Sequence, residues 1–229
     1  MVIAGLQKLT LLDYPGKIAC TVFTAGCNFR CPFCHNASLV VGGPGELMTE
    51  EEFFAFLEHR RGVLGGVCVT GGEPTLQRDL LNFLDEIKKK DYSVKLDTNG
   101  YKPEMLKNAV SAGLVDYAAM DIKNCREKYA LTTGVKDFDF TPIEESIEFL
   151  LSGTVEYEFR TTVVKELHTQ QDIAKIGGMI AGAEKYFLQG FIDSGDLIAE
   201  GFSGYDENEM KNLLKTAKKY IPSAELRGF

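Results

Sequence analysis

Short apolar runs alternate with amphipathic helical patterns along most of this 229-residue chain. Six of the runs have the length and composition of buried strands, and they cover residues 17–26, 65–70, 93–98, 115–123, 155–164 and 185–191. Strands that are separated by single helices pair in parallel through right-handed crossovers. The sequence therefore predicts an α/β fold with a parallel sheet, which is either open and doubly wound or closed, fully or partly, into a barrel.

Capping residues mark where several of the helices begin. Thr49 with Glu52, and Asp206 with Glu209, have the spacing of a capping box. Neither a strand-linked GxGxxG nor a GxxxxGK[ST] loop occurs in the sequence, so dinucleotide and P-loop nucleotide binding have no motif to support them. No internal repeat or low-complexity linker divides the chain, and we expect one domain over residues 1–229.

Charge and hydropathy narrow the class of protein. Acidic residues outnumber basic ones, 33 to 25, for a net charge of −8, which argues against broad nucleic-acid binding. No apolar stretch approaches the roughly 18 residues of a membrane-spanning helix, and the N-terminus lacks the features of a secretion signal. We therefore expect a cytoplasmic protein, in which disulfides are rare. Of the six cysteines, the isolated Cys20, Cys68 and Cys125 are expected to be small buried side chains.

Polar motifs follow four consecutive predicted strands. A cysteine-rich loop follows the first strand, GGEPT follows the second, DTNG ends the third and MDIK ends the fourth. Because the carboxyl ends of parallel strands meet at one edge of the sheet, these motifs are expected to form one site.

The cysteine-rich loop, TAGCNFRCPFCHN, holds Cys27, Cys31 and Cys34 within eight positions. Three cysteines can hold a 4Fe–4S cluster and leave its fourth iron open to a ligand. Two other interpretations remain. CPFC has the spacing of a dithiol redox motif, but this leaves Cys27 unexplained. A structural zinc site could use His35 as fourth ligand, although His35 is adjacent to Cys34 and neighbouring residues rarely reach one tetrahedral ion.

The motifs resemble those of a known family. CNFRCPFC fits the C-x3-C-x2-C signature of radical S-adenosylmethionine (SAM) enzymes, and GGEPT fits their second motif. With DYPGK, LDTNG and MDIK in addition, the chain is similar to the glycyl-radical-enzyme activases. Among these it is most like the longer form of the anaerobic ribonucleoside-triphosphate reductase activating protein. The similarity extends to about residue 165.

The resemblance implies a fold and an activity. The fold would be a partial (β/α)6 TIM-like barrel, with a core at about 17–191 and a C-terminal extension at about 192–229. Cys27, Cys31 and Cys34 would hold one 4Fe–4S cluster whose open iron binds SAM. Reductive cleavage of SAM would give a 5′-deoxyadenosyl radical, which abstracts a glycine Cα hydrogen in a partner glycyl radical enzyme, namely an anaerobic ribonucleotide reductase. A flavodoxin or ferredoxin would supply the electron.

Two motifs are expected to bind the methionyl part and the adenine of SAM. Gly71 and Gly72 would let the backbone approach the cofactor closely, and Glu73 would hold the methionyl ammonium. Phe33 would lie beside the adenine, or its ring would brace the cluster loop instead.

The resemblance also gives roles to the third and fourth motifs. Asp97, Thr98 and Asp121 would surround a monovalent cation, for which oxygen ligands are suitable, while both aspartates contact SAM. Lys123 would lie near the methionyl carboxylate. Strand-end aspartates that only make turn hydrogen bonds are the alternative.

Several further residues are left with open or minor roles. Arg160 could face the same site or form a structural ion pair, and His35 with Asn36 could tune the cluster or cap its loop. His59 and His168 are expected on the solvent side. Residues 190–205 are glycine-rich and could be a loop over the site or an ordinary connection.

Other functions remain open at this point. The chain could activate another glycyl radical enzyme, such as one of the pyruvate formate-lyase type. It could act on a small molecule in the manner of the 7-carboxy-7-deazaguanine synthases. A non-catalytic zinc or dithiol binding module is the alternative from a different class.

Overall fold

The computed structural model describes residues 1–42 and 47–228. They form one eight-stranded sheet in which the strands follow one another in sequence order. The six predicted strands are all present and pair in parallel. They are β2 (Ala19–Thr24), β3 (Gly66–Gly71), β4 (Ser93–Thr98), β5 (Tyr117–Asp121), β6 (Glu156–Val163) and β7 (Tyr186–Gly190).

The sheet has one unpredicted strand at each edge. β1 (Ile3–Thr10) pairs antiparallel with β2, and β8 (Glu225–Arg227) pairs parallel with β7. β1 has three exposed residues in a row instead of a clean alternation, and β8 has only three residues, so neither has a recognisable strand pattern. Within the described residues β1 and β8 are not paired with each other. The barrel is therefore partial, as predicted.

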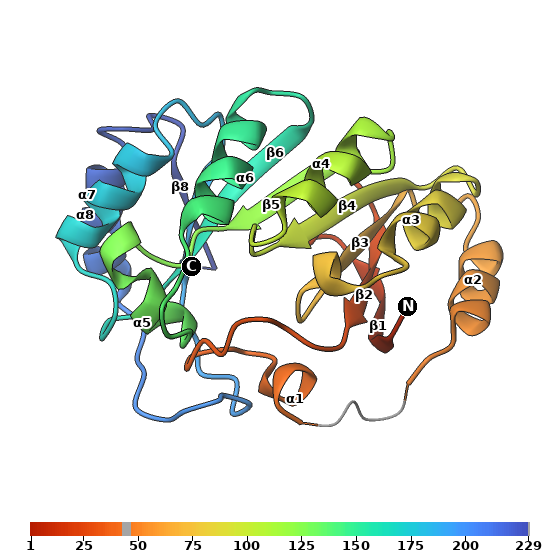
Figure 1. The fold of residues 1–229 in the computed structure, drawn as a ribbon, viewed down its shortest axis with the longest axis horizontal. Coiled ribbons are helices and arrows are strands. Elements are labelled where there is room, and N and C mark those ends of the chain that lie inside the picture. The colour runs from red at the N-terminus through yellow and green to blue at the C-terminus, as the bar shows by residue number, and fades with distance from the viewer. Residues whose placement is uncertain (43–46, 229) are drawn as a thin grey trace.

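Helices lie along the outer side of the curved sheet (Figure 1). As the predicted alternation requires, a helix follows each of the parallel strands β2 to β7, and these helices are α2 (Glu50–His59), α3 (Leu80–Lys88), α4 (Pro103–Ser111), α6 (Thr141–Leu151), α7 (Gln170–Met179) and α8 (Glu207–Ala217). Both predicted capping boxes form, at Thr49 and at Asp206. The short helices α1 (Ala37–Val40) and α5 (Tyr129–Thr133) were not predicted, nor were the 3₁₀ turns η1 (Pro74–Leu76) and η2 (Arg126–Lys128).

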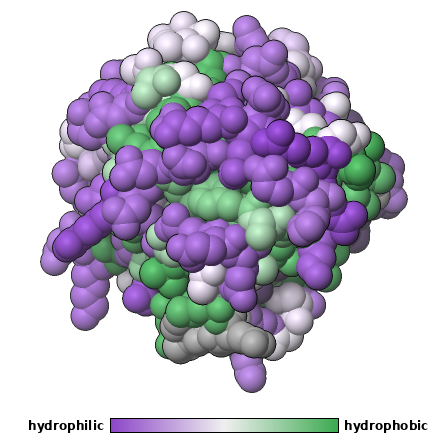
Figure 2. Space-filling view, turned by 90° about the vertical axis from the view of Figure 1, so that its right-hand side faces the viewer, coloured by the Kyte–Doolittle hydropathy of each residue, from purple (hydrophilic) through white to green (hydrophobic). Residues whose placement is uncertain are grey.

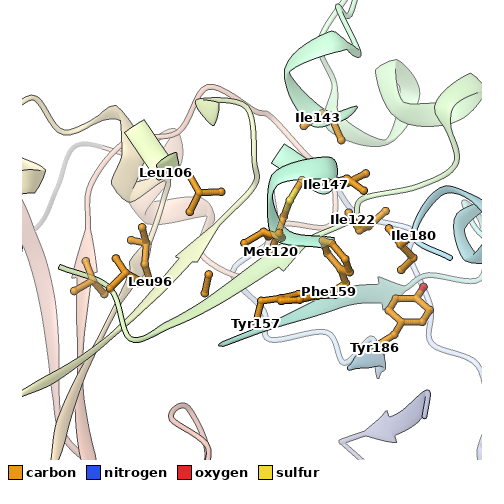
Figure 3. Packing of buried hydrophobic residues seen from close by; sticks show 14 of the residues in the cluster. Leu96, Leu106, Met120, Ile122, Ile143, Ile147, Tyr157, Phe159, Ile180 and Tyr186 are labelled. Carbon is orange, nitrogen blue, oxygen red and sulfur yellow. The ribbon is translucent and has the colours of Figure 1, made fainter. Parts of the chain in front are cut away.

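The main core lies between the sheet and these helices. Leu96, Met120 and Phe159, on three neighbouring strands, are fully buried there with side chains of α4 and α6 (Figure 3). Successive side chains of a strand point to opposite faces of the sheet. The residues that follow these three directly are Asp97, Asp121 and Arg160, which therefore point to the inner side of the barrel.

The face of the molecule that carries α2 is mostly polar. Hydrophilic side chains predominate on this face, with apolar areas scattered between them (Figure 2). Among the described residues, every helix is too short or too polar to span a membrane.

Candidate active site

One cavity of about 810 Å³, a volume that counts open solvent at its mouth, lies at the carboxyl ends of β2 to β6. The four sequence motifs meet there, as expected from parallel strands. All of the predicted site residues line this cavity, and they are Cys27, Cys31, Phe33, Cys34, Gly71, Gly72, Glu73, Asp97, Thr98, Asp121 and Lys123. Arg160, His35 and Asn36 line it as well.

The cysteine loop, residues 25–36, joins β2 to α1 and is held by backbone hydrogen bonds from three directions. Gly26 N donates to Leu39 O at 2.8 Å, Arg30 N donates to Thr133 O at 2.8 Å, and Pro32 O accepts from Ala199 N at 2.9 Å. These anchors come from α1, from α5 and from the segment after β7, so the loop is shaped by distant parts of the chain.

The guanidinium group of Arg30 also stabilises this loop. It donates to Cys27 O at 2.6 Å and to Phe29 O at 2.8 Å. The guanidinium group is therefore bound to the backbone of the loop. These hydrogen bonds help the loop keep its shape around the three cysteines.

The three thiols are in a setting that suits an iron–sulfur cluster. Burial raises the pKa of Cys31 to about 12 and that of Cys27 to about 11, and the neighbouring Lys123 lowers both in part. Ligation needs thiolates, so loading this site would release protons. In the described parts of the chain, no three His, Cys, Asp or Glu side chains are placed to hold a single metal ion. Thiols spread around a cavity fit a cluster with several irons better than the zinc alternative.

Two glycines allow the second motif to lie directly against the cysteine loop. A Cβ atom on Gly71, whose φ is +115°, would lie 2.3 Å from Thr24 N, and one on Gly72 would lie 1.9 Å from Gly26 O. Gly72 N donates to Thr24 O and Glu73 N donates to Gly26 O, both at 2.8 Å. Glycine is thus required for the backbone contact between β2 and β3 as well as for an open approach from the cavity.

Glu73 is a buried hydrogen-bond hub that joins the second and third motifs. Its Oε1 accepts from Thr75 N at 3.1 Å, Thr75 Oγ1 at 2.5 Å and Thr98 Oγ1 at 2.8 Å. Its Oε2 accepts from Asn99 N at 2.6 Å. Burial raises the pKa of Glu73, although these donors counteract part of the effect. The carboxylate is already largely satisfied by the protein, with Oε2 the less used oxygen.

Asn99 connects this hub to the cysteine loop, and its contacts were not anticipated from the sequence. Its Nδ2 donates to Asn28 Oδ1 at 2.9 Å and lies 3.8 Å from Cys27 Sγ. Nδ2 of Asn28 is buried and has no hydrogen-bond partner among the described residues. The side-chain amides of Asn28 and Asn99 therefore lie next to Cys27. A sulfur atom of a bound cluster could accept a hydrogen bond from such a group. The sequence did contain a hint of this role, because Asn99 belongs to the DTNG motif that was already assigned to the site.

Five charged side chains form a chain of ion pairs along the inner face of β4, β5 and β6. Lys95 Nζ pairs with Asp97 Oδ1, and Arg160 Nη1 pairs with Asp97 Oδ2 at 3.1 Å. Arg160 Nε pairs with Asp121 Oδ1 at 2.9 Å, and Lys123 Nζ pairs with Asp121 Oδ2 at 3.0 Å. Arg160 thus faces the site and forms an ion pair there, so its two predicted alternatives both hold.

The pKa values follow from these contacts. Burial alone would raise the pKa of Asp97, but Arg160 and Lys95 outweigh it and the pKa is lowered. The pKa of Asp121 is lowered for the same reason, here by Arg160 and Lys123. Both carboxyl groups are therefore ionised at neutral pH.

The predicted ligands of a monovalent cation are already engaged with other groups. Each of the four carboxylate oxygens of Asp97 and Asp121 pairs with a cationic nitrogen, and Arg160 supplies two of these four nitrogens. The hydroxyl of Thr98 donates to Glu73 and accepts from Gly100 N at 3.0 Å. A metal cation would have to displace a lysine or an arginine, so this donor set does not fit the predicted monovalent cation.

Aromatic packing braces the cysteine loop from outside. The ring of Phe33 is buried and lies edge-on to Phe191 and Phe202, with ring centroids 6.4 Å away in both cases. The ring of His35 lies 5.2 Å from that of Phe191. These contacts support the bracing role of Phe33. The segment after β7 packs on the cysteine loop and so does more than connect two elements.

The prediction for His168 was wrong. The side chain is fully buried, with Val164 N donating to its Nδ1 at 3.1 Å and Lys123 O at 2.8 Å from its Nε2. A histidine that receives one hydrogen bond and donates the other is neutral, and burial lowers its pKa. His59 is exposed as predicted, and the isolated cysteines Cys20, Cys68 and Cys125 are buried as predicted.

Comparisons with known proteins identify the family. The model of the Radical SAM superfamily matches residues 21–171. A candidate glycyl-radical enzyme activating enzyme of Methanocaldococcus jannaschii is 32% identical over 237 residues, which cover 98% of this chain and 95% of the relative. The pyruvate formate-lyase-activating enzyme of Clostridium pasteurianum is 29% identical over 189 residues, covering 78% of this chain and 75% of that enzyme.

A solved structure shares the fold. Streptococcus suis SuiB, bound to the precursor peptide SuiA, superposes with a TM-score of 0.71 at 13% identity and covers 91% of this chain and 48% of that chain. The family implies a 4Fe–4S cluster and SAM, and the cavity has three cysteines for the former. Since the family model spans most of the chain and the archaeal relative matches almost all of it, the chain belongs to the radical SAM superfamily.

Proposed function

We propose that this chain is a cytoplasmic activating enzyme that installs a glycyl radical in a partner protein, and that the partner is an anaerobic ribonucleoside-triphosphate reductase. The chain would act as one radical SAM domain, with residues from about 192 onward as a C-terminal extension. A flavodoxin or ferredoxin would be the electron donor.

One observation carries the proposal. The three cysteines share a single cavity with the GGE, DTN and DIK motifs, each at the end of its own strand. The similarity to a candidate activating enzyme over 98% of the chain supports the same class of reaction. When bound there, a reduced 4Fe–4S cluster and SAM supply a 5′-deoxyadenosyl radical that can take a hydrogen atom from a glycine Cα.

The residues of the chain would hold and orient the cofactors. Cys27, Cys31 and Cys34 would bind three irons, and Gly71 and Gly72 would leave room for the methionyl part of SAM. Lys123 lies on the cavity wall with a raised pKa, because burial, which lowers the pKa, is outweighed by the charge and hydrogen bond of Asp121 together with the nearby cysteines. It is therefore a permanent cation that suits the methionyl carboxylate.

Glu73 would hold the methionyl ammonium of SAM through one oxygen of its carboxylate. Four hydrogen bonds from the protein already fix its carboxylate, and only Oε2 has room for a further donor such as the methionyl ammonium. Phe33 would contribute through the shape of the loop next to the adenine, since its ring is packed against Phe191 and Phe202.

The test is an anaerobic activation assay. The cluster is reconstituted without oxygen and reduced, and SAM and an anaerobic ribonucleotide reductase from the same source are added. An EPR spectrum of the mixture is recorded and 5′-deoxyadenosine is quantified in the same sample. We expect a glycyl radical doublet on the partner that is absent with the Cys31→Ala variant and retained with Cys20→Ala.

Other outcomes separate the alternatives. Deoxyadenosine without a doublet would keep the radical chemistry and point to another glycyl radical enzyme or to a small-molecule substrate. A content of about four iron and four sulfide per chain is expected after reconstitution. One zinc and no sulfide would contradict the proposal and favour a zinc binding module.

A further inference from the structure

We propose that Lys95 and Arg160 supply, from the protein itself, the positive charge that Asp97 and Asp121 require, so that the site binds SAM without a metal cation. This inference rests on the proposed binding of SAM in the cavity. It assigns a positioning role to Lys95, a residue that does not line the cavity and acts through Asp97.

Lys95 is placed by the strand that carries it. It lies two residues before Asp97 in β4, and side chains two apart on a strand share a face. Only 1% of the residue is exposed, and its Nζ contacts Asp97 Oδ1 and lies 3.9 Å from Cys68 Sγ. An ammonium group in such a place is costly unless it is paired. The Asp97 carboxylate is the partner that offsets this cost.

Arg160 occupies the position between the two aspartates. It is the residue opposite Asp121 in the parallel register of β5 and β6. One guanidinium group thereby bridges a carboxylate on β4 and a carboxylate on β5, which is the bridging function that a bound cation would otherwise serve. The planar, permanently charged fork of arginine suits such a bridge.

The charged groups of the site leave no excess of negative charge for an added cation. Three carboxylates, those of Glu73, Asp97 and Asp121, share the site with three cationic side chains, Lys95, Arg160 and Lys123, so the six charges sum to zero. A further monovalent cation would therefore find no unbalanced carboxylate there.

The experiment measures SAM affinity in matched salts. The reconstituted wild-type protein is titrated with SAM by calorimetry in KCl, in NaCl and in choline chloride at one ionic strength. We expect the dissociation constants to agree within about twofold, since no metal is bound on complex formation. The Lys95→Met variant is expected to bind at least about tenfold more weakly in choline chloride, because Asp97 loses a buried partner. Potassium should restore part of that affinity by taking the vacated place.

Two further variants control for effects on folding. Lys95→Arg keeps the charge and should remain insensitive to the choice of salt. Lys175→Met, which breaks an exposed pair with Glu127, should behave as wild type. The ratio of affinities in potassium and choline is informative because a purely structural role of Lys95 would weaken binding equally in both salts.

The outcomes of the wild-type titration separate the two proposals. No SAM binding in any salt, with an intact cluster, would contradict the proposed function. Binding that is strong in KCl and at least about tenfold weaker in choline chloride would overturn the present inference alone. Equal affinity of Lys95→Met and wild type for SAM in choline chloride would show that Lys95 does not contribute to SAM binding.

Discussion

Arg160 and Asp121 lie opposite each other on neighbouring parallel strands, and Nε of the arginine donates to Oδ1 of the aspartate at 2.9 Å. The same guanidinium group reaches Asp97 on the next strand. The centre of the site is therefore held together by one side chain that links three strands. We expect the stability of the apo protein to depend on Arg160 for this reason.

The Arg160→Met variant should be much less stable than wild type. It would leave Asp97 and Asp121 with one cationic partner each, and removing one member of a buried pair costs about 3–5 kcal/mol. Urea unfolding of the apo protein measures the loss. The Arg61→Met variant, which breaks an exposed pair with Glu58, should change the unfolding free energy by less than about 0.5 kcal/mol. Equal effects of the two substitutions would contradict a central role for Arg160.

The same network predicts how stability depends on pH. The folded-state pKa values of Asp97 and Asp121 are lowered by their cationic neighbours. Their contribution to stability is therefore present above the unfolded value of about 4, and it is lost as the pH falls from there through the folded values. Arg160→Met should reduce this acid dependence, because the folded pKa values move back toward the ordinary one. Unfolding free energies measured between pH 7 and pH 3 test the expectation.

The cysteines should fall into two groups. Cys27→Ala, Cys31→Ala and Cys34→Ala are each expected to abolish SAM cleavage, because each removes one of the three proposed cluster ligands that line the cavity. Cys20→Ala, in β2, and Cys125→Ala, whose Sγ lies 3.4 Å from Asp172 Oδ1, should retain it. The measurement is 5′-deoxyadenosine formed per chain, with iron content as a second readout. Loss of the cluster in Cys125→Ala would indicate a fourth thiolate ligand and a closed cluster.

Glu73→Gln should weaken both the fold and the cluster site. The variant amide would present an NH₂ group to donors that now point at a carboxylate, at a cost of about 1–3 kcal/mol for an unsatisfied buried group. Because Asn99 N donates to Glu73 and Asn99 Nδ2 lies next to Cys27, the cluster yield after reconstitution should fall as well. The exposed Glu86→Gln is the matched control. A variant with full stability and normal cluster yield would contradict the role of Glu73 as a hub.

The sheet and the position of the site were predictable because they depend on order along the chain. Apolar runs alternating with helices determine parallel pairing, and parallel pairing brings the motifs after β2, β3, β4 and β5 to one edge. The edge strand β1 was missed because it pairs on one side for most of its length and lacks a clean alternation of buried and exposed residues.

The ion pairs depend on register, which the sequence does not specify. Lys95 with Asp97, and Asp121 with Lys123, could have been paired from their spacing of two residues within or next to a strand. The contact of Arg160 with both aspartates could not, because it requires the exact alignment of β4, β5 and β6. The cation site at Asp97, Thr98 and Asp121 was expected from the family resemblance, which carries no information on the position of Arg160 between the two carboxylates.

The burial of His168 likewise depends on tertiary contacts that the sequence does not specify. Its segment, KELHTQQ, is polar, yet the turn after β6 folds back so that the imidazole ring is buried against the backbone of Lys123. Burial lowers its pKa, so the neutral ring contributes stability above the unfolded value of about 6.5, and this contribution is lost as the pH falls below that value.

The His168→Gln variant should therefore be less stable than wild type at pH 8 by about 1–3 kcal/mol, because Val164 N or Lys123 O would lose a well-placed partner. The difference should shrink as the pH is lowered from 7 to 5, since only the wild-type protein then gains a proton on unfolding at this position. Urea unfolding across this range measures both quantities, and the exposed His59→Gln variant should show neither effect. A difference that stays constant with pH would mean that folding leaves the pKa of His168 unchanged, which would contradict a neutral ring held by burial.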